Sequence, residues 1–329
     1  MKLSQLGEFG IISRIQRATP KGPGVLLGIG DDAAWIRTRT GSCLITADLL
    51  LERIHFQLGW TSLYELGHKS LAVNLSDIAA MGGIPAYLIL SLGVPPTFSA
   101  ADIDEFYRGI RSLASKTGVS LVGGDTNAAD ALVISVCVIG HAVYRPITRS
   151  GAKTGDDIYV TGTLGDSALA LKLLMRKTAV KKDRAVKYLL CRHHRPTPRL
   201  RAGALLAKEN LARAMIDVSD GLLQDLGHLC KASGVGALIL EESLPLSPAY
   251  RSLAAKDGTG YALSGGEDYE LLFCVRRKDR SRMEKIKRRL EVPITHIGQC
   301  VDAGRGVQII DGNRRPLHLP AGGHDHFKQ

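Results

Sequence analysis

Two aspartates that lie three residues apart, with a hydroxyl residue between them, form the most chemically suggestive motif in this sequence. Asp217, Ser219 and Asp220 belong to the segment AMIDVSDGLLQDLGHLC (214–230). The apolar residues before Asp217 predict a short buried strand, and the apolar spacing after Asp220 predicts an amphipathic helix. Both carboxylates should therefore project from a strand-to-helix junction, where bound cations would stabilise two neighbouring negative charges.

The same pairing of aspartate with Gly, Ser or Thr beside apolar residues occurs four more times. The segments are GIGDDAA (28–34), LITADLL (44–50), NLSDIAA (74–80) and LVGGDTN (121–127). One such pair alone is typical of a helix cap or a turn, but five in one chain indicate a common site. The carboxylates concerned are Asp31, Asp32, Asp48, Asp77, Asp125, Asp217 and Asp220.

These carboxylates predict a magnesium site. Like charges about 4 Å apart repel by about 4 kcal/mol per pair at an effective dielectric constant of about 20, so converging aspartates need divalent cations between them. Thr46, Ser219 and backbone carbonyls add oxygen ligands without a Cys or His cluster, which favours Mg²⁺ over Zn²⁺. Because Mg²⁺ held by a few carboxylates commonly completes its coordination with substrate phosphates, the sequence indicates nucleotide chemistry.

Two common glycine-rich phosphate loops are absent from the sequence. The segments nearest to GxxxxGK[ST], GHKS (67–70) and GAKTGD (151–156), lack the leading glycine at the required spacing. A protein-kinase GxGxxG with its accompanying motifs is missing as well. Nucleotide phosphates would then be held by metal ions, by backbone N–H groups at 123–124, and by Arg149 or Lys153.

The overall composition favours a cytoplasmic enzyme over a nucleic-acid-binding or membrane protein. The net charge of +11 comes largely from two runs, 176–187 and 276–290, which we interpret as solvated faces of surface helices, and aromatic residues make up only 5%. Six scattered cysteines without a CxxC pair indicate reduced thiols. We expect no signal peptide and no membrane association, because the most apolar segment, 131–143, is too short to cross a bilayer.

Strand and helix patterns alternate in both halves of the 329-residue chain, which predicts two domains of mixed α/β (α+β) class. The clearest helix, 62–83, places Ser70, Asn74 and Asp77 on one narrow polar stripe. A Pro-, Gly- and basic-rich connection at 144–156 divides the domains into 1–146 and 147–329. Other helices are expected at 1–20, 100–118 and 201–212, a strand, turn and helix at 157–174, and strands at 25–36, 42–56, 86–95, 120–127, 131–143 and 236–240, with the acids in turns or loops that end strands.

Eight motifs in this order resemble the thiamine-monophosphate kinase family of the aminoimidazole ribonucleotide synthetase-like superfamily. They are GIGDDAA, TADLLLERIHF, KSLAVNLSDIAAMGGIP, GGDTN, ITRSGAKTGDDIYVTGTLGDS, HRPTPRL, IDVSDGL and SGGEDYEL. The resemblance implies direct, Mg²⁺-dependent transfer of the ATP γ-phosphoryl group to thiamine monophosphate, the last step of thiamine diphosphate biosynthesis. It also implies an N-terminal domain that binds metal and ATP and forms a homodimer, and a C-terminal domain that completes the active site.

Matched motif by motif, the resemblance assigns roles to individual residues. The implied metal ligands are Asp31, Thr46, Ala47, Asp48, Asp77, Asp125, Asp217 and Asp220, with Asp48, Asp125 and Asp217 as the catalytic set. The implied ATP contacts are Gly124, Asp125, Arg149, Ser219 and Tyr107, and the implied thiamine monophosphate contacts are His55, Glu267 and His324.

Three residues depart from the family's pattern. Ala47 replaces a hydroxyl residue, so it can bind a metal only through its carbonyl. Arg53 stands where Gly is usual and is expected to point outward. His324 replaces a larger aromatic residue, which weakens any stacking on thiamine.

The chemistry implied by the resemblance needs no general base, because the acceptor is already an anionic phosphate. The obstacle is the repulsion between two polyanions that must meet in line. Catalysis is then expected to consist of positioning and electrostatic stabilisation by Mg²⁺.

Several of these residues also have structural interpretations. His55 could finish a strand, Glu267 could cap the strand that follows a Gly-Gly turn, and Asp32 could serve a turn as readily as a metal. We interpret His193 and His194 as structural, and Arg195, Pro196 and Arg199 as a rigid loop held extended by two prolines.

Rival functions remain within and outside the superfamily. Selenophosphate synthetases and hydrogenase-maturation dehydratases need a reactive Cys near an N-terminal glycine-rich segment or at the C-terminus, whereas here Cys43 comes first and the last residues are HDHFKQ. Substrate-specific segments of aminoimidazole ribonucleotide synthetase are not evident. A polyanion-binding protein or a noncatalytic metal-binding scaffold would lack Mg²⁺-dependent nucleotide turnover.

Overall fold

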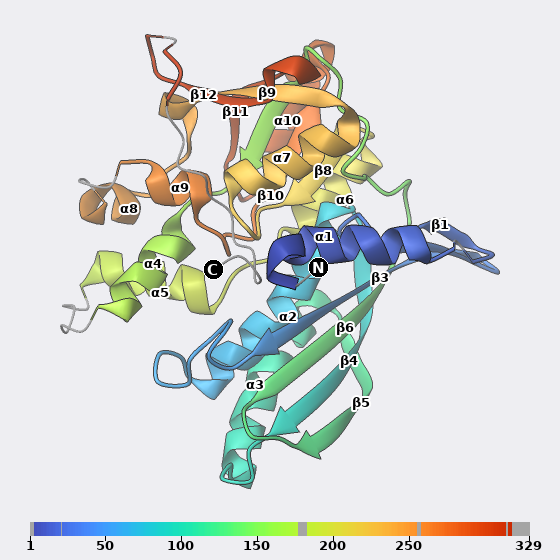
Figure 1. Cartoon of the computed structure of the whole chain (residues 1–329), viewed down its shortest axis with the longest axis vertical. Helices are drawn as coiled ribbons and strands as arrows, with labels where there is room; N and C mark the ends of the chain where they lie inside the picture. Colours follow the sequence, from blue (N-terminus) through green and yellow to red (C-terminus); the bar gives the residue numbers. More distant parts are fainter. Residues whose placement is uncertain (1–2, 21, 177–182, 255–257, 314, 318–329) are drawn as a thin grey trace.

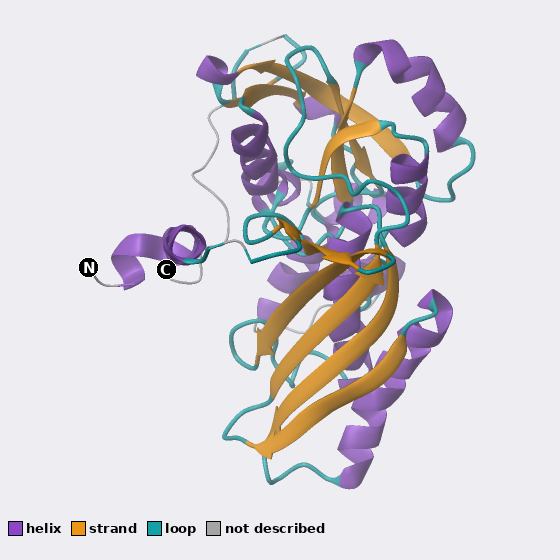
Figure 2. Ribbon diagram, turned by 90° about the vertical axis from the view of Figure 1, so that its right-hand side faces the viewer, coloured by secondary structure: helices purple, strands orange, loops and turns teal. Residues whose placement is uncertain are grey.

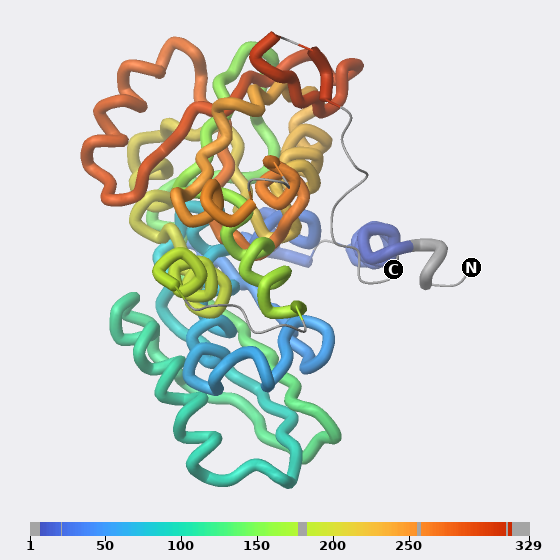
Figure 3. Tube along the Cα trace, turned by 90° about the vertical axis from the view of Figure 1, so that its left-hand side faces the viewer, coloured from blue at the N-terminus to red at the C-terminus, as the bar shows by residue number. Residues whose placement is uncertain are grey.

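Two α/β halves, each built on a six-stranded sheet, make up the chain (Figure 1). The computed structural model describes residues 3–20, 22–176, 183–254, 258–313 and 315–317. Figure 3 shows the N-terminal sheet at the bottom, coloured blue to green, and the later strands at the top, coloured orange to red. The segment 142–156, which contains the predicted domain boundary, runs between the sheets without regular secondary structure.

In the described part of the chain, helices cover the N-terminal sheet on one face only. Its order is β1 (Val25–Leu27), β2 (Ala34–Thr38), β3 (Gly41–Leu51), β6 (Val133–His141), β4 (Ile84–Val94) and β5 (Ser120–Ala128), and all neighbours are antiparallel except β4 and β5. Helices α2 (Leu63–Ala80) and α3 (Ala100–Thr117) lie against one face (Figure 2). On β3, Leu44, Thr46 and Leu50 are buried, whereas Ala47 and Leu49 are exposed, as the alternation of a half-covered strand requires.

Helix α2 is held by close backbone contacts on two sides. It begins with a reciprocal capping box between Ser62 and Glu65. A Cβ added to Gly67 would lie 2.1 Å from the Phe106 carbonyl oxygen of α3, and one added to Gly109 would lie 1.9 Å from the Tyr64 carbonyl oxygen of α2. On the other side, a Cβ at Gly203 would lie 2.0 Å from the Ala79 carbonyl oxygen. These crossings leave no room for a side chain.

The C-terminal sheet has the order β12 (Val307–Ile310), β9 (Val235–Leu240), β11 (Ile294–Asp302), β7 (Asp157–Thr161), β10 (Leu271–Val275) and β8 (Ala212–Asp217). Only β12 and β9 are parallel among these neighbours. The helices of this half are α4 (Asp166–Met175), α5 (Arg184–His194), α6 (Leu200–Lys208), α7 (Leu222–Ser233), α8 (Pro248–Leu253), α9 (Gly260–Ser264) and α10 (Arg280–Lys287). The central strands β7 and β10 are buried along their whole length.

Helix α1 (Leu3–Ala18) connects the two halves near the predicted site. The centre of its Phe9 ring lies 4.5 Å from the centre of the His228 ring on α7. Its Gln16 amide donates to the carbonyl of Ile29, at 2.5 Å, just before the Asp31–Asp32 pair. Among the described residues, no helix combines the length and apolar character needed to cross a membrane.

The predicted mixed α/β class and most elements are confirmed, but several local predictions were wrong. Asp48 and Asp125 lie inside β3 and β5 rather than in turns or loops at strand ends. The predicted strand 25–36 is two strands with the acidic pair between them. The predicted helix 201–212 stops at Lys208, because Ala212 already belongs to β8, and His193 and His194 finish α5 instead of starting an extended loop.

The interpretation of the two basic runs as surface helices is supported for one run, and part of the other run lies outside the described residues. In the run 276–290, Met283 and Ile286 are buried on α10, so the surface-helix interpretation holds there. In the run 176–187, α5 begins at Arg184, and residues 177–182 lie outside the described part of the chain.

Candidate active site

Three carboxylates from three separate elements converge between the two halves. Asp32 follows β1, Asp77 lies in the last turn of α2, and Asp217 ends β8; one oxygen of each lies within 4.8 Å of the others. One carboxylate oxygen of Asp32, Oδ2, is buried and has no hydrogen-bond donor among the described residues. Three carboxylates, one of which has a buried oxygen without a hydrogen-bond donor, offer the oxygen ligands that a hard divalent cation such as Mg²⁺ prefers.

Neutral side chains orient these acids. The Thr46 hydroxyl donates to Asp77 Oδ2 at 2.5 Å, and the Ser76 hydroxyl donates to Asp217 Oδ2 at 2.6 Å. The backbone N–H of Asp48 donates to the Asn74 amide oxygen at 3.2 Å. Strands β3 and β8 are thus both tied to α2, and the predicted polar stripe of that helix is buried at Ser70 and Asn74.

The acids perturb one another strongly. Burial and the neighbouring Asp32 raise the pKa of Asp217 to about 7, and the same two causes raise the pKa of Asp31 to about 7. Burial raises the pKa of Asp48 to about 6. Burial together with Asp48 and Asp217 raises the pKa of Asp77 well above its ordinary value. Without a cation, the group must hold protons at neutral pH.

This leads to a testable pH dependence. Asp31 and Asp217 have folded-state pKa values of about 7 against an ordinary 3.8, so the folded state binds more protons than the unfolded state between these values, and stability falls as pH rises through that window. We expect the melting temperature of metal-free protein to drop from about pH 5 to about pH 8, and Mg²⁺ to reduce the drop because it binds deprotonated ligands. Thermal unfolding in chelator and in Mg²⁺ checks this, with Asp217→Asn giving a shallower slope in chelator. A melting temperature that rises with pH in chelator would contradict it.

Arg149 holds the acidic pair that follows β1. Its guanidinium contacts Asp32 Oδ1 at 2.8 Å, and its backbone N–H donates to both carboxylate oxygens of Asp31, at 3.1 and 3.2 Å. Burial alone would lower the pKa of Arg149, but Asp32 and Asp31 outweigh it and raise that pKa. Asp32, which the sequence left between a turn and a metal role, joins the three-acid group. A metal contact for Asp31 stays a prediction.

A further buried acid, Asp225, shapes the turn of the opening motif. Its Oδ2 accepts the backbone N–H groups of Ser219, Asp220 and Gly221 at 3.0, 3.1 and 3.1 Å. The side chain of Asp220 in turn accepts the Gln224 amide at 2.9 Å. Asp225 was not predicted as a site residue, although an acid four residues after Gly221 in the first helical turn is the signal of such a cap.

A second polar group surrounds Glu267. The Lys69 ammonium on α2 lies 2.7 Å from Glu267 Oε1, and His193 Nδ1 lies 3.3 Å from Oε2. His193 Nδ1 also lies 2.9 Å from the Ser167 hydroxyl on α4. Burial alone would raise the pKa of Glu267, but Lys69 and His193, with a smaller contribution from His55, lower it. His55 and Glu267 therefore lie near each other. Lys69 was not predicted as a site residue from the sequence.

The predicted structural loop after α5 is held by a buried acid. Arg199 and Arg192 both contact Glu270, the latter at 2.7 Å, and the Thr161 hydroxyl donates to Glu270 at 2.6 Å. These contacts agree with a structural interpretation of Arg199.

Asp125 lies apart from the acid group within one chain. Register places Asp48, Val136, Leu90 and Gly124 side by side across four strands, and Asp125 is the residue after Gly124. Three strand spacings correspond to about 14 Å. Asp125 pairs with Ser91 on the face opposite to the helices, and its partners are the Thr126 N–H at 2.9 Å and the Asn127 amide at 2.8 Å.

One other implied contact, Tyr107, is not part of the three-acid group. Tyr107 is on α3, edge-on to Phe106 with 5.8 Å between ring centres. His324 lies outside the described residues. Asp125 and Tyr107 are therefore not part of the three-acid group, and the implied roles of Asp125, Tyr107 and His324 stay predictions.

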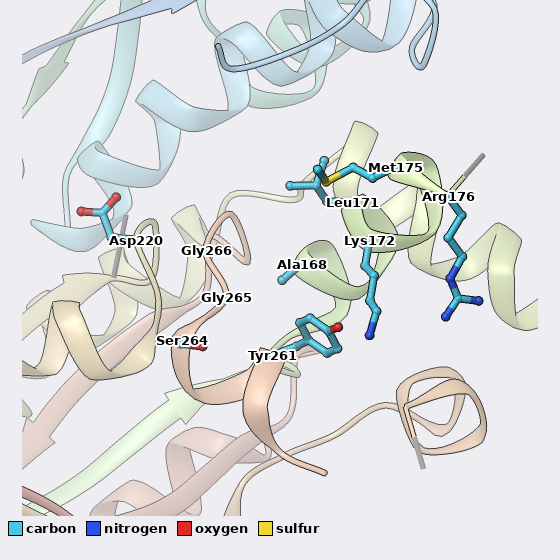
Figure 4. Close-up of a pocket in the computed structure, with 10 residues that line it drawn as sticks. All are labelled: Ala168, Leu171, Lys172, Met175, Arg176, Asp220, Tyr261, Ser264, Gly265 and Gly266. Carbon is cyan, nitrogen blue, oxygen red and sulfur yellow. The ribbon is translucent and has the colours of Figure 1, made fainter. Parts of the chain in front are cut away.

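A cavity of about 660 Å³ opens beside the aspartate turn. Figure 4 shows Asp220 on one side and Tyr261 with Lys172 of α4 on the other, with the Gly265–Gly266 segment between them. The Lys172 ammonium lies 4.9 Å from the centre of the Tyr261 ring. The remaining lining is Ala168, Leu171, Met175, Arg176 and Ser264. The cavity is thus apolar on the α4 side, with an aromatic face able to hold a cation.

Comparison with known proteins places the chain in a family. Two family models match in tandem, "AIR synthase related protein, N-terminal domain" over residues 30–142 and "AIR synthase related protein, C-terminal domain" over residues 153–311. Thiamine-monophosphate kinase of Escherichia coli (strain K12) is 41% identical over 326 residues, covering 98% of both chains. The enzyme of the same name from Bacillus subtilis (strain 168) is 37% identical over 327 residues, covering 98% of this chain and 100% of its own.

Solved structures give the same result. "AaThiL complexed with AMPPCP and TMP" matches with a TM-score of 0.85 at 33% identity, covering 99% of each chain. Thiamine-monophosphate kinase from Stenotrophomonas maltophilia K279a matches with a TM-score of 0.76 at 40% identity, covering 92% of this chain and 96% of its own. The E. coli hydrogenase maturation protein HypE has a TM-score of 0.69 at 20% identity, with 97% and 98% covered, and shares the fold alone.

Proposed function

This chain belongs to the thiamine-monophosphate kinase family, and from that premise we infer that it transfers the γ-phosphoryl group of ATP to the phosphate of thiamine monophosphate, yielding thiamine diphosphate and ADP. The observation that carries the inference is the convergence of Asp32, Asp77 and Asp217 between the two halves. Such a group can gather cations where two polyanionic substrates must meet.

We propose that Asp32, Asp77 and Asp217 hold Mg²⁺, with Asp31, Thr46, the Ala47 carbonyl, Asp48 and Asp220 as further ligands. When bound, Mg²⁺ neutralises phosphate charge and so lets the donor and acceptor phosphates approach. The chain's own contribution is to hold these oxygens ready. Thr46 and Ser76 fix the rotation of two carboxylates, and Arg149 fixes the acidic pair from the opposite side.

For the nucleotide, we propose phosphate contacts from Arg149 and Ser219, because both lie next to the acids. The Arg149 Nε is buried and has no hydrogen-bond acceptor among the described residues, so a phosphate oxygen could satisfy it. A Cβ at Gly124 would lie 1.8 Å from the Leu90 carbonyl, so this position has no room for a side chain. Nucleotide contacts from Gly124 and Tyr107 remain proposals from the resemblance.

For the acceptor, we propose that the thiamine rings occupy the cavity of about 660 Å³ beside Asp220, whose lining ends at Gly266, the residue before Glu267. Glu267 and His55 are not among the residues that line this cavity, and their contacts with the acceptor remain proposals from the resemblance. Two features support this location of the rings. The cavity adjoins the aspartate turn, so a phosphate at its inner end would reach the metal ligands. The Tyr261 ring also lines the cavity, and an aromatic ring attracts a cation such as the thiazolium ring of thiamine.

Changing Tyr261 to alanine tests that location. We expect KM for thiamine monophosphate to rise about tenfold, as loss of a partly buried cation–π contact predicts, while KM for ATP stays within about twofold. Steady-state kinetics with each substrate varied in turn measure both values, and Tyr144→Ala, at an exposed tyrosine of the connecting segment, is the control. Equal rises in both KM values would place the rings elsewhere.

We further propose a homodimer formed through the N-terminal sheets. Its helix-free face exposes Leu49, Tyr87 and Ile89, and the nine residues of the edge strand β5 are all exposed. A long uncovered edge with apolar side chains invites pairing with another chain. A second copy of this chain is the occupant we propose, because Asp125 on that face then gains a route to the partner's acid group, which it cannot reach within its own chain.

The function is tested by measuring ADP release with thiamine monophosphate, thiamine or an aminoimidazole ribonucleotide precursor as acceptor, each with Mg²⁺ or with chelator. We expect ADP only with thiamine monophosphate and only with Mg²⁺. ADP release with another acceptor, or none with any, would refute the proposed activity. Salt-sensitive oligonucleotide binding without turnover would favour a polyanion-binding protein instead.

A further inference from the structure

Lys69 is a buried cation that the proposed phosphoryl transfer does not use. It lies on α2 with its side chain 6% exposed, and its ammonium is 2.7 Å from Glu267 Oε1 in the C-terminal half. A buried lysine is costly unless it is paired. The pair itself gives weak net stability, so its presence at a substrate-facing glutamate calls for a functional reason.

Lys69 and the metal-binding region share one side of α2. Lys69 and Ser76 are seven residues apart, which places them two turns apart on the same side, about 10 Å along the axis. Ser76 contacts Asp217, and Lys69 contacts Glu267. Among its contacts with the C-terminal half, helix α2 therefore has one beside the acids for the phosphates and one beside the residue implied to bind thiamine.

The backbone of Glu267 is fixed, but its carboxylate needs partners to be oriented. The Glu267 N–H donates to the Ser219 carbonyl at 2.7 Å, and the Tyr269 N–H donates to the Val218 carbonyl at 2.9 Å. Glu267 has a left-handed backbone with φ of 65°, which costs free energy in a residue other than glycine. The turn thus sets the direction of the Cα–Cβ bond of Glu267. Contacts with Lys69 and His193 then hold the two carboxylate oxygens in place.

The two partners of the carboxylate differ in charge. Burial lowers the pKa of His193 to about 3, so its ring is neutral at physiological pH. Lys69 therefore supplies the full positive charge in direct contact with Glu267. The Glu267 side chain is 27% exposed, and its oxygens have lone pairs beyond those that Lys69 and His193 occupy. The carboxylate can accept a further donor.

We propose that Lys69 is a positioning residue for acceptor recognition: it orients the Glu267 carboxylate and keeps it ionised so that Glu267 can bind the cationic, N–H-bearing ring system of thiamine monophosphate. This rests on the proposed function of Glu267 as an acceptor contact. Without Lys69, the Glu267 carboxylate loses the partner that holds Oε1 and is free to rotate toward solvent, which weakens its attraction for a cation at the acceptor site.

The test is a kinetic comparison of Lys69→Met, Lys69→Arg and Glu267→Gln in the full-length protein. Lys69→Met should raise KM for thiamine monophosphate about tenfold while kcat at saturating acceptor and KM for ATP stay within about twofold. Lys69→Arg should recover most of the loss, because it restores the charge. Lys116→Met, at an exposed lysine of α3, is the matched control and should change neither constant.

A double-mutant cycle separates positioning from a direct role. If Lys69 acts through Glu267, then Lys69→Met in the Glu267→Gln background should add less than about twofold to KM. Effects that multiply independently, or an equal rise in KM for ATP, would overturn the proposal. Should Lys69→Met not fold, Lys69→Gln, which keeps a hydrogen-bond donor, replaces it with the same expected direction.

The same variants distinguish a failure of the role proposed for Lys69 from a failure of the assignment of Glu267 to the acceptor. If Glu267→Gln leaves KM for thiamine monophosphate unchanged, the assignment of Glu267 to the acceptor is wrong. If Glu267→Gln raises that KM but the Lys69 variants do not, the role of Lys69 is overturned while the acceptor assignment stands.

Discussion

Replacing Asp217 with alanine is expected to lower kcat by about a thousandfold or more while the fold survives. Asp217 supplies one of three carboxylates whose oxygens lie within 4.8 Å of one another, and it is held there by Ser76. Its removal takes away a ligand at the point where phosphate charge must be neutralised. Because it also removes one of several crowded negative charges, the metal-free variant should melt at or above the temperature of the unmodified protein.

The measurement is ADP release at saturating Mg²⁺, together with thermal unfolding in chelator. Asp48→Ala is expected to behave in the same way as Asp217→Ala. Asp104→Asn, at an exposed acid of α3, is the control and should keep full activity. Near-normal turnover by either active-site variant at saturating Mg²⁺ would show that the acid group is not the metal site.

Asp125→Ala is expected to be nearly as inactive as Asp217→Ala, although Asp125 is three strands away from Asp48 in its own chain. The reason is the proposed dimer, in which Asp125 serves the partner's site. Mixing the two inactive variants should then restore activity, because a mixed dimer has one site with both aspartates intact. If subunits exchange freely, half the dimers are mixed and about one quarter of the original activity returns.

The control for subunit exchange is to mix each variant with itself under the same conditions, which should restore nothing. Analytical ultracentrifugation of the mixture establishes whether dimers are present. If dimers form and exchange but the mixture stays inactive, Asp125 acts within its own chain or not at all. The proposed complementation between subunits would then be wrong.

Local patterns in the sequence were sufficient for helix α2 and for part of the site. The apolar period of α2 and the polar stripe at Ser70, Asn74 and Asp77 fixed which side of that helix faces other elements, and the structure pairs Asp77 with Thr46. The position of Asp125 could not be obtained in this way. An aspartate between glycine and threonine is typical of a turn, whereas here strand pairing with β4 keeps it extended.

The residues that the sequence analysis missed share one property: their partners are distant in the chain. Lys69 and Glu267 are separated by almost two hundred positions, so nothing near Lys69 reveals the ion pair. Asp32 was ambiguous for a similar reason, because its deciding neighbours, Asp77 and Asp217, come from other elements. Asp225 is the exception, because its three N–H partners are close to it in the chain. Its position in the first turn of a helix is a pattern that can be recognised in the sequence.

The backbone contacts of α2 bear on how this chain tolerates variation. Gly67, Gly109 and Gly203 sit where a methyl group would collide with a carbonyl oxygen of the neighbouring helix. The helix they clamp carries Lys69, Ser76 and Asp77, so any shift of its axis displaces the anchor points for both substrates at once. In a saturation mutagenesis survey, Gly67, Gly109 and Gly203 should tolerate substitution as poorly as the aspartates do. They would then be mistaken for residues that bind substrate or metal, although their role is to let the helices pack closely.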